Sequence, residues 1–543
     1  MTGVDESGGV DDEGALVRYK NRWAKLADQA IRCISQRGLT IAEGPLGNGS
    51  PLEGEGGASL ILDEAIKTSL CLTYAQAVLG LSVEENISSL IAQRSLSLPL
   101  LSLSEEVEAL FEDWRSAITL TEVELITGFG LFYEALLQYS FSAEQHRSES
   151  RLVTITVSRG DSRKIRGAHF TPKIVAEEVT SQALHYLDRD LNGLGLSLDD
   201  QLQQGELRVC DPSAGAGIFL ITCARQLAFR LAHRQAHRSK SRDAANLLSK
   251  RAEVEPRTLR LVIEQCLFGI ELDGGAALVT TLSLWALAGG APETLRYLER
   301  HIIVGNALTH SPLRWGIHAF DLILGNPPYI SMYGRGSQAH RYSADELRLL
   351  REQMVHIDDE RVVSGRLNLF LSFMVLSTRW LEGDVSLERE QKGRSGLIAF
   401  VLPDTIITNE AYTSMRQVLT KSGRLIEAQR HQSSLFQGAS VGTAIIYWRS
   451  GLHLSAVNHS LKVRLSEVDD RQVSVEEGRH IIIKRPGCSW QAVSTDTLTE
   501  AALLGSHSAP LIEFAAVRDG FNTGSAERRR ALITRELPPP YES

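Results

Sequence analysis

Short apolar runs alternate with amphipathic segments through the middle of the chain. Seven runs have the length and composition of buried strands: LRVC at 207–210, CLFGIEL at 266–272, HIIVG at 301–305, FDLILGN at 320–326, GLIAFVLP at 396–403, RLIEAQR at 424–430 and TAIIYW at 443–448. Helical spacing separates most of them, as in IFLITCARQLAFRLAHR. The alternation predicts an α/β fold with a doubly wound, mostly parallel, seven-stranded sheet covered on both faces. No helical pattern separates the last two runs, which predicts an antiparallel hairpin at one edge.

The pattern before residue 150 and after residue 450 is different. Apolar residues recur every three or four positions between about residues 59 and 142, as in GLFYEALLQYSF, which predicts a helical domain. After Trp448 the pattern weakens to short strand-like runs. We therefore predict a disordered acidic start at 1–15, an N-terminal helical domain at 16–150, an α/β domain at 151–450 and a C-terminal extension at 451–543.

Charge is divided unevenly along the chain. The 543 residues include 57 Lys and Arg and 66 Asp and Glu, a formal net charge of −9. Residues 1–150 carry a net charge of −13, so the remainder carries +4. The whole-chain charge is therefore a poor guide to binding partners, and it does not exclude a nucleic-acid partner.

Two function classes are made improbable by composition. No apolar run reaches the roughly 18–20 residues that span a bilayer, and the start is acidic, so we expect a cytoplasmic rather than a secreted or membrane protein. The six cysteines have no CxxC spacing, so we expect neither a zinc site, nor any other metal site, nor a disulfide framework.

A ligand-binding turn is predicted where the first of the seven strands ends. The run from Asp211 to Gly217 reads DPSAGAG and opens into a helix. Small residues let the backbone turn tightly and approach a ligand, and strand ends in doubly wound sheets face the binding crevice. The run lacks the following Lys-Ser or Lys-Thr of a Walker loop and differs from GxGxxG. Glu271, at the end of the next strand, is a candidate acceptor for ribose hydroxyls.

A basic stripe follows the turn. Arg230, Arg234, Arg238 and Arg242 recur every four residues, so in a helix they lie on one face. Two readings stay open: a solvated helix face, or a surface that contacts the phosphates of a nucleic acid.

The most specific motif is Asn326-Pro327-Pro328-Tyr329, which ends the apolar run FDLILG. The prolines make the turn rigid and remove backbone donors. The side-chain carbonyl of Asn326 and the main-chain carbonyl of Pro327 can accept both hydrogens of an amino group. The ring of Tyr329 offers a flat surface for stacking.

With these motifs in this order, the chain resembles the N6-adenine-specific DNA methyltransferases of the γ order, the NPPY type found as large methylase subunits of restriction-modification and related phage-defence systems. The resemblance covers about 165–448. It implies a class I S-adenosylmethionine-dependent methyltransferase domain with a Rossmann-like sheet, and S-adenosylmethionine as the cofactor. It also implies that an adenine flipped out of double-stranded DNA is methylated directly on its amino nitrogen.

The resemblance assigns further residues. It identifies RGAHFTPKIVAEEV as the N-terminal cofactor motif, with Phe170 beside the methionine part of the cofactor. Asn306 falls where the family often has an Asp that contacts the cofactor adenine, which is a departure. Phe436 is a candidate neighbour of the target base, together with Tyr329. The predicted cofactor residues are Phe170, Thr171, Pro172, Asp211, Pro212, Ser213, Ala214, Gly215, Gly217, Glu271, Asn306 and Ala307, and the predicted catalytic residues are Asn326, Pro327, Pro328 and Tyr329.

Alternatives remain at this stage. NPPY loops also serve methyltransferases that act on RNA bases or on the glutamine amide of proteins, and a non-catalytic assembly subunit could retain the fold. The segment 516–530 resembles the beginning of a target-recognition domain, but only 13 residues follow it. Either the recognition domain lies on another polypeptide or the chain is truncated. We expect a separate specificity subunit, or other defence-system proteins, as partners.

Overall fold

The computed structural model describes most of the helices and strands that the sequence predicts. The residues described are 12–37, 39–41, 55–83, 101–103, 105–143, 152–153, 155–159, 171–239, 254–329, 348, 368–382, 396–431, 442–451, 461–468, 480–483 and 492–493. The chain divides into two compact units, Met1–Ala492 and Val493–Ser543. Everything below concerns the first unit.

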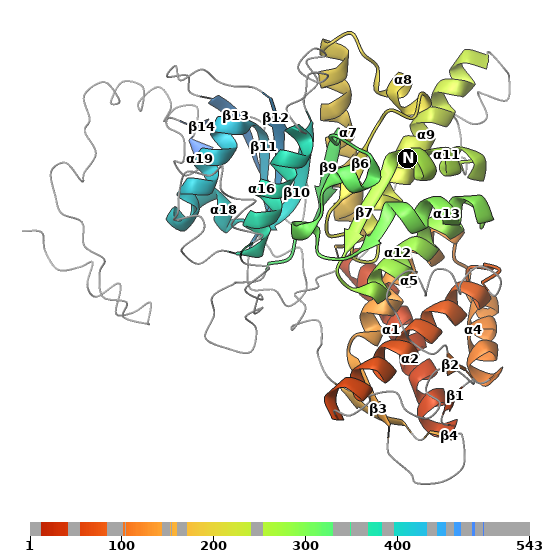
Figure 1. The fold of residues 1–543 in the computed structure, drawn as a ribbon. Helices are drawn as coiled ribbons and strands as arrows, with labels where there is room; N and C mark the ends of the chain where they lie inside the picture. The colour runs from red at the N-terminus through yellow and green to blue at the C-terminus, as the bar shows by residue number, and fades with distance from the viewer. Residues whose placement is uncertain are drawn as a thin grey trace, which may run out of the picture. The chain divides into compact units, whose positions relative to one another are not determined.

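In the part of the N-terminal region that the structure describes, four helices surround an aromatic core (Figure 1). They are α1 (Asp12–Arg37), α2 (Glu55–Ala77), α4 (Glu105–Ala117) and α5 (Glu122–Leu136). Tyr74 of α2 stacks on Phe129 and Phe132 of α5 with ring centroids 4.4 and 5.1 Å apart. Thr121 and Glu124 form a capping box that fixes the start of α5.

Helix α1 corrects one prediction. It begins at Asp12, so residues 12–15 belong to a helix and not to a disordered start.

Two small sheets accompany these helices. Strands β1 (Leu39–Ile41), β2 (Leu101–Ser102) and β4 (Leu152–Val153) form one of them, in the order β2-β1-β4. Strands β3 (Tyr139–Ala143) and β5 (Ile155–Arg159) form the other. Residues 152–159, which follow the predicted boundary at 150, therefore pair with strands of the N-terminal region.

A ten-stranded sheet contains all seven predicted strands (Figure 1). Its order is β15-β14-β13-β11-β12-β10-β9-β6-β7-β8. The seven are β6 (Val209–Asp211), β7 (Leu267–Glu271), β8 (Ile302–Val304), β9 (Leu322–Gly325), β10 (Leu397–Pro403), β11 (Gly423–His431) and β12 (Thr443–Ser450). Strands β6 to β10 pair in parallel, which confirms the predicted doubly wound sheet.

The predicted antiparallel pair also forms, but not at an edge. Strand β12 lies antiparallel between β10 and β11. Strand β11 then pairs in parallel with β13 (Leu461–Val468), which is followed in the sheet by β14 (His480–Ile483) and β15 (Ala492–Val493). Residues beyond the predicted boundary at 450 thus extend the central sheet.

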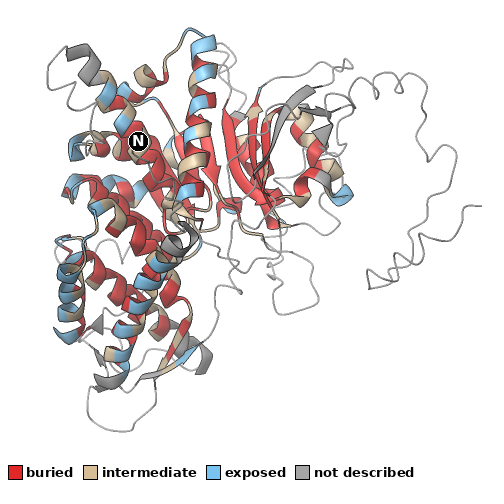
Figure 2. Cartoon of the chain, turned by 180° about the vertical axis from the view of Figure 1, so that it is seen from behind, coloured by how far each residue is buried: buried red, intermediate tan, exposed pale blue. Residues whose placement is uncertain are grey.

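Helices cover both faces of the sheet, and the strands between them are buried (Figure 2). The core on one face includes apolar residues of α7 (Lys173–Gly193), α8 (Leu198–Gln203), α9 (Ile218–Ser239), α11 (Pro256–Cys266), α12 (Gly274–Leu287) and α13 (Pro292–His301). This core continues without a break into the core of the N-terminal helices. The opposite face is covered by α16 (Leu369–Glu382), α18 (Thr405–Thr408) and α19 (Thr413–Ser422). Alternate residues along β10 supply the two cores, because successive side chains of a strand point to opposite faces.

Candidate functional site

The candidate site lies where the parallel strands β6, β7, β8 and β9 end. Parallel strands bring their carboxyl ends to the same edge of a sheet, where ligands bind in doubly wound folds. The four strands end at or just before Asp211, Glu271, Asn306 and Asn326, which are all predicted site residues. The fold therefore brings the predicted cofactor and catalytic motifs to one edge.

The glycine turn is fixed by hydrogen bonds from two neighbouring elements. The N–H of Ala214 donates to the carbonyl of Ile270 at 2.9 Å, which ties the turn to β7. Oγ1 of Thr280, on α12, donates to the carbonyl of Gly215 at 2.7 Å. Gly215 and Gly217 have φ values of 54° and 84°, a region that L-amino acids with side chains rarely adopt.

Gly215 and Gly217 have different roles. A Cβ on Gly217 would lie 2.9 Å from Cγ2 of Thr280, so this glycine permits close packing on α12. A Cβ on Gly215 would meet nothing within 4 Å. The backbone at Gly215 is thus open on the side where a ligand could approach it.

Glu271 is held by the turn that it faces. Its carboxylate accepts hydrogen bonds from the N–H of Gly215 at 2.7 Å and from the N–H of Asp273 at 2.8 Å. Each bond occupies one of the two carboxylate oxygens, and a carboxylate oxygen has further acceptor capacity. The geometry fixes the orientation of Glu271 and leaves it able to accept hydrogen bonds from vicinal hydroxyls.

Asp211 is buried at the end of β6. Its Oδ1 accepts a hydrogen bond from the N–H of Ser213 at 2.9 Å, whereas Oδ2 has no hydrogen-bond partner among the described residues. Oγ of Ser213 is likewise buried without such a partner. Burial raises the pKa of Asp211 to about 8, against the lowering effect of the Ser213 N–H. A cationic ligand group would favour the charged carboxylate, so these polar atoms fit S-adenosylmethionine, whose methionine part carries an ammonium group.

Asn306 has a local structural role. Its Oδ1 accepts the N–H of Leu308 at 3.0 Å and caps a short 3-10 helix, Ala307–Thr309, in which Ala307 is buried. An Asn suits this cap because its side-chain oxygen can accept a backbone N–H. The predicted contact of Asn306 with the cofactor adenine stays a prediction.

The predicted catalytic motif leaves the sheet from the fully buried strand β9. Gly325, just before Asn326, packs against Asp211: a Cβ at this position would lie 2.5 Å from Oδ1 of Asp211. Nδ2 of Asn326 donates to Oγ1 of Thr171 at 3.2 Å. The motif is thus connected to the glycine turn through Asp211 and to the segment before α7 through Thr171.

Tyr329 packs edge-to-face against Phe370 of α16, with ring centroids 6.4 Å apart. Burial raises the pKa of its phenol well above the usual value, so the hydroxyl stays protonated at physiological pH. Pro327 is buried beside it and Pro328 is half-buried. This support fixes the direction in which the chain leaves β9.

Of the other predicted site residues, the structure describes some and not others. Thr171 is buried and Pro172 precedes the first residue of α7 as its N-cap. Phe170, Phe436 and Arg242 lie outside the described residues, and for Arg238 only the helical backbone is described.

Two arginines of the predicted basic stripe form ion pairs with acidic residues of neighbouring helices. Arg230 pairs with Asp188 at 2.9 Å and with Asp199, and Arg234 pairs with Asp200 at 2.6 Å. These contacts join α9 to α7 and α8. These two arginines therefore join helices through ion pairs and do not form a purely solvated helix face, whereas contact of the stripe with nucleic-acid phosphates stays a prediction.

Sequence reasoning missed several residues that hold this site. Thr280 appeared as one more residue of an apolar helix, and its spacing carried no sign of its bond to Gly215. Asp273 follows Glu271 by two positions and caps α12 through the N–H of Ala276 at 2.9 Å, a role that the sequence DGGAA before a helix could have indicated. Leu272 between them is 65% exposed and offers an apolar surface beside Glu271.

The described residues contain no group of three or more His, Cys, Asp or Glu side chains able to hold a metal ion. Among the helices described, none is long and apolar enough to cross a membrane.

Comparison with known proteins gives a local sequence similarity. No protein-family profile matches the chain. A stretch of 133 residues, 24% of this chain, is 29% identical to the Type II methyltransferase M.TthHB8I of Thermus thermophilus. That stretch spans 27% of the length of the Thermus protein.

The fold is similar to solved structures of restriction-modification enzymes. A nuclease-deletion mutant of the Type ISP enzyme LlaGI, solved with a DNA substrate mimic, superposes with a TM-score of 0.51 at 12% identity, over 91% of this chain and 46% of that one. A type I restriction-modification methyltransferase subunit from Streptococcus thermophilus superposes with a TM-score of 0.37 at 14% identity, over 75% of this chain and 63% of that one.

The order of the central sheet, the motifs gathered at its edge and the local sequence similarity lead to one conclusion. The chain has the class I fold of S-adenosylmethionine-dependent methyltransferases, and 133 of its residues are similar in sequence to a Type II methyltransferase.

Proposed function

We propose that this protein transfers a methyl group from S-adenosylmethionine to the N6 amino group of adenine in DNA, as part of a restriction-modification or phage-defence system. The observation that carries the proposal is the position of Asn326. It follows β9 directly, is hydrogen-bonded to Thr171 and lies next to the glycine that packs on Asp211 of the cofactor turn. The proposed site for the substrate amino group therefore lies next to the proposed cofactor site, at the edge of the sheet where the parallel strands end.

The cofactor's binding residues are proposed from this geometry. Glu271 would accept hydrogen bonds from the ribose hydroxyls, the backbone at Gly215 leaves room for the cofactor, and the exposed side chain of Leu272 would offer an apolar contact to the adenine ring. Asp211 complements the cationic methionine part. When bound, S-adenosylmethionine supplies a methyl group activated by the positive charge on sulfur.

The catalytic residues act on the amino group of the target base. An exocyclic amine is a poor nucleophile because its lone pair is delocalised into the ring. The side-chain carbonyl of Asn326 and the main-chain carbonyl of Pro327 accept hydrogen bonds from its two N–H groups, which favours a more tetrahedral nitrogen with an available lone pair. This lone pair forms the new N–C bond as the C–S bond of the methyl donor breaks, and the nitrogen then releases one proton to solvent. Tyr329 stacks on the base, and its edge-to-face contact with Phe370 fixes the orientation of its ring. Catalysis then comes from positioning and electrostatics, with no covalent enzyme intermediate.

DNA is proposed as the substrate because the sequence relative is a Type II methyltransferase and the structure of LlaGI, a Type ISP restriction-modification enzyme, was solved with a DNA substrate mimic. An adenine in a duplex cannot reach a buried amino-acceptor site, so the base has to be flipped out. The net charge of +4 over residues 151–543 is small for a DNA-binding protein, so a separate specificity subunit is proposed to supply sequence recognition and further DNA affinity.

Methyl transfer from labelled S-adenosylmethionine tests this proposal. Purified protein is assayed with unmethylated double-stranded DNA, with single-stranded RNA and with a glutamine-containing protein lysate, and modified DNA is analysed for N6-methyladenine. We expect label in DNA, on N6 of adenine, in the wild type. Asn326→Ala should lose transfer and keep cofactor binding. Label in RNA or protein alone would overturn the choice of substrate, and normal turnover by Asn326→Ala would overturn the role of the motif.

A further inference from the structure

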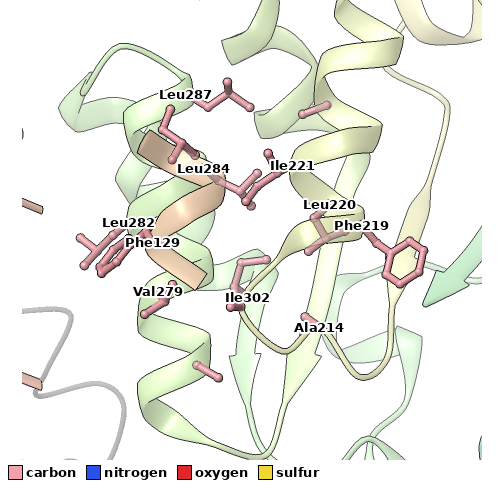
Figure 3. Packing of buried hydrophobic residues seen from close by; sticks show 14 of the residues in the cluster. Phe129, Ala214, Phe219, Leu220, Ile221, Val279, Leu282, Leu284, Leu287 and Ile302 are labelled. Atoms are coloured by element: carbon pink, nitrogen blue, oxygen red, sulfur yellow. The ribbon is translucent and has the colours of Figure 1, made fainter. Parts of the chain in front are cut away.

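Helix α5 of the N-terminal region packs against the cofactor elements of the α/β domain. Phe129 of α5 lies beside Leu282 of α12, the helix that follows Glu271 (Figure 3). The two helices belong to one continuous buried core. The predicted cofactor and catalytic residues all lie between positions 170 and 329, so none of them belongs to α5.

One contact of α5 is a hydrogen bond to the residue beside Glu271. The hydroxyl of Tyr133 donates to Oδ1 of Asp273 at 2.6 Å. The same Oδ1 caps α12 through the N–H of Ala276. Gly275 makes room for the tyrosine, because a Cβ there would lie 2.2 Å from the Tyr133 hydroxyl oxygen.

This bond continues into the cofactor site. The N–H of Asp273 donates to one oxygen of Glu271, and the N–H of Gly215 donates to the other. Tyr133 therefore stands at the outer end of a hydrogen-bonded series that runs through Asp273 and Glu271 to the glycine turn. Movement of Tyr133 would shift the backbone at Asp273 and with it the orientation of the Glu271 carboxylate.

A second contact of α5 reaches the glycine turn directly. A Cβ on Gly130 would lie 3.1 Å from Cβ of Ala216, so the helix backbone already approaches the turn as closely as packing allows. Gly130 and Tyr133 are three positions apart and so lie on the same side of α5. One side of this helix thus contacts both parts of the proposed cofactor site.

We propose that Tyr133 and Gly130 are positioning residues through which the N-terminal helical domain sets the affinity for S-adenosylmethionine. Neither residue touches the cofactor in this arrangement. They hold Glu271 and Gly215 in the geometry that binds it. By linkage, cofactor binding then strengthens the contact of α5 with the turn by the same factor. The inference concerns the cofactor alone and does not depend on which methyl acceptor is correct.

Direct titration of the full chain with S-adenosylmethionine and with S-adenosylhomocysteine tests this inference. Tyr133→Phe keeps the ring and removes the hydroxyl, and we expect Kd for both ligands to rise about three- to tenfold, the range of one lost hydrogen bond. The kcat at saturating cofactor should change little, while KM for the cofactor rises.

Gly130→Ala separates positioning from folding. Alanine favours a helix interior more than glycine does, which offsets part or all of the cost of overpacking, so the free energy of unfolding should fall by no more than in Tyr74→Phe. The new Cβ presses on Ala216, and we expect a Kd at least about threefold higher, because the affected turn has little room to move. A variant that binds the cofactor more weakly than an equally or more destabilised Tyr74→Phe cannot be explained by general loosening.

Tyr74→Phe is the matched control. The hydroxyl of Tyr74 donates to the carbonyl of Leu125 at 3.0 Å, inside the N-terminal core and away from Asp273. It should lower stability without changing Kd. Wild-type Kd values in both Gly130→Ala and Tyr133→Phe, or an equal weakening in Tyr74→Phe, would overturn the proposal. If Tyr133→Phe fails to fold, the Kd of Gly130→Ala decides it.

Discussion

Nδ2 of Asn326 donates a hydrogen bond to Oγ1 of Thr171 at 3.2 Å. The bond joins the catalytic motif at the end of β9 to the segment that precedes α7. Because the amide nitrogen is directed at Thr171, the amide oxygen is the end that can face a substrate amino group. Thr171 therefore decides which way the Asn326 side chain is oriented.

Replacement of Thr171 should affect turnover more than cofactor binding. Thr171→Val keeps the shape and removes the acceptor, so Asn326 loses its orienting bond. We expect kcat to fall about two- to tenfold, the equivalent of ~0.5–1.5 kcal/mol, and Kd for S-adenosylmethionine to stay within about twofold. Thr171→Ser retains the hydroxyl and should keep near-normal kcat. Equal kcat values for the Val and Ser variants in a methyl-transfer assay would contradict this role.

Gly325→Ala should disturb both folding and cofactor binding. The new Cβ would lie 2.5 Å from Oδ1 of buried Asp211, and the backbone φ of 155° adds strain. Overpacking of this kind costs about 1–3 kcal/mol. We expect a lower free energy of unfolding in denaturant and a weaker Kd in cofactor titration.

Gly316→Ala is the control for that substitution. Its φ of 70° also disfavours alanine, but a Cβ there meets nothing within 4 Å. It should cost stability through backbone strain alone and leave Kd unchanged. If Gly325→Ala binds the cofactor like the wild type, the packing of Gly325 on Asp211 has no bearing on the site.

Cofactor affinity should depend on pH through Asp211. Burial raises the pKa of its carboxyl to about 8, so the folded protein holds a proton there that the unfolded chain, with a pKa near 3.8, has released. The cationic methionine part prefers the carboxylate, and deprotonation becomes more complete as the pH rises toward 8. We therefore expect Kd for S-adenosylmethionine to fall about tenfold per pH unit between pH 6 and 7.5.

In the protein without ligand, a rise in pH should lower the free energy of unfolding, whereas it should strengthen cofactor binding. Because the folded state binds the extra proton, the free energy of unfolding should decrease as the pH rises from about 4 to 8. Asp211→Asn should abolish both slopes, measured by titration calorimetry and by denaturant unfolding. A wild-type Kd that is flat over this range would show that Asp211 does not meet the cofactor's charge.

The central sheet could be predicted from the sequence because its strands are buried on both faces. Runs such as LIAFVLP in β10 are continuously apolar, and all seven predicted strands lie in the sheet. The sequence placed the antiparallel pair of β11 and β12 at the edge of the sheet. It lies inside the sheet because β11 also pairs with β13, and the sequence of β13 carries only a weak strand pattern.

The site was predictable at its motifs but not at their supports. Asp211 and Asn326 stand in recognisable runs at strand ends. Tyr133 and Thr280 are ordinary members of apolar helices, and only the packing of α5 on α12 brings the tyrosine to Asp273. Local patterns predict which residues lie at the sheet edge, whereas contacts between distant helices depend on the whole fold.

The last prediction concerns the arginines of α9. Arg230 is about one-third exposed and pairs with Asp188 and Asp199. Partly exposed pairs of this kind contribute about 1 kcal/mol or less, so Arg230→Ala should lower the free energy of unfolding by no more than about that amount. Asp199→Asn should have a similar effect, because it removes a partner in the same pairs.

DNA binding as a function of salt distinguishes this role from phosphate contact. Each phosphate contact adds about 0.9 to the steepness of log K against log salt. If Arg230 serves only to join α9 to α7 and α8, Arg230→Ala leaves the slope unchanged while stability drops. A slope that becomes shallower by about one in Arg230→Ala, with no such change in Asp199→Asn, would instead assign Arg230 to the DNA surface. Because the guanidinium of Arg230 is already paired with Asp188 and Asp199 in the folded protein, we expect Arg230→Ala to lower stability and to leave the salt slope of DNA binding unchanged.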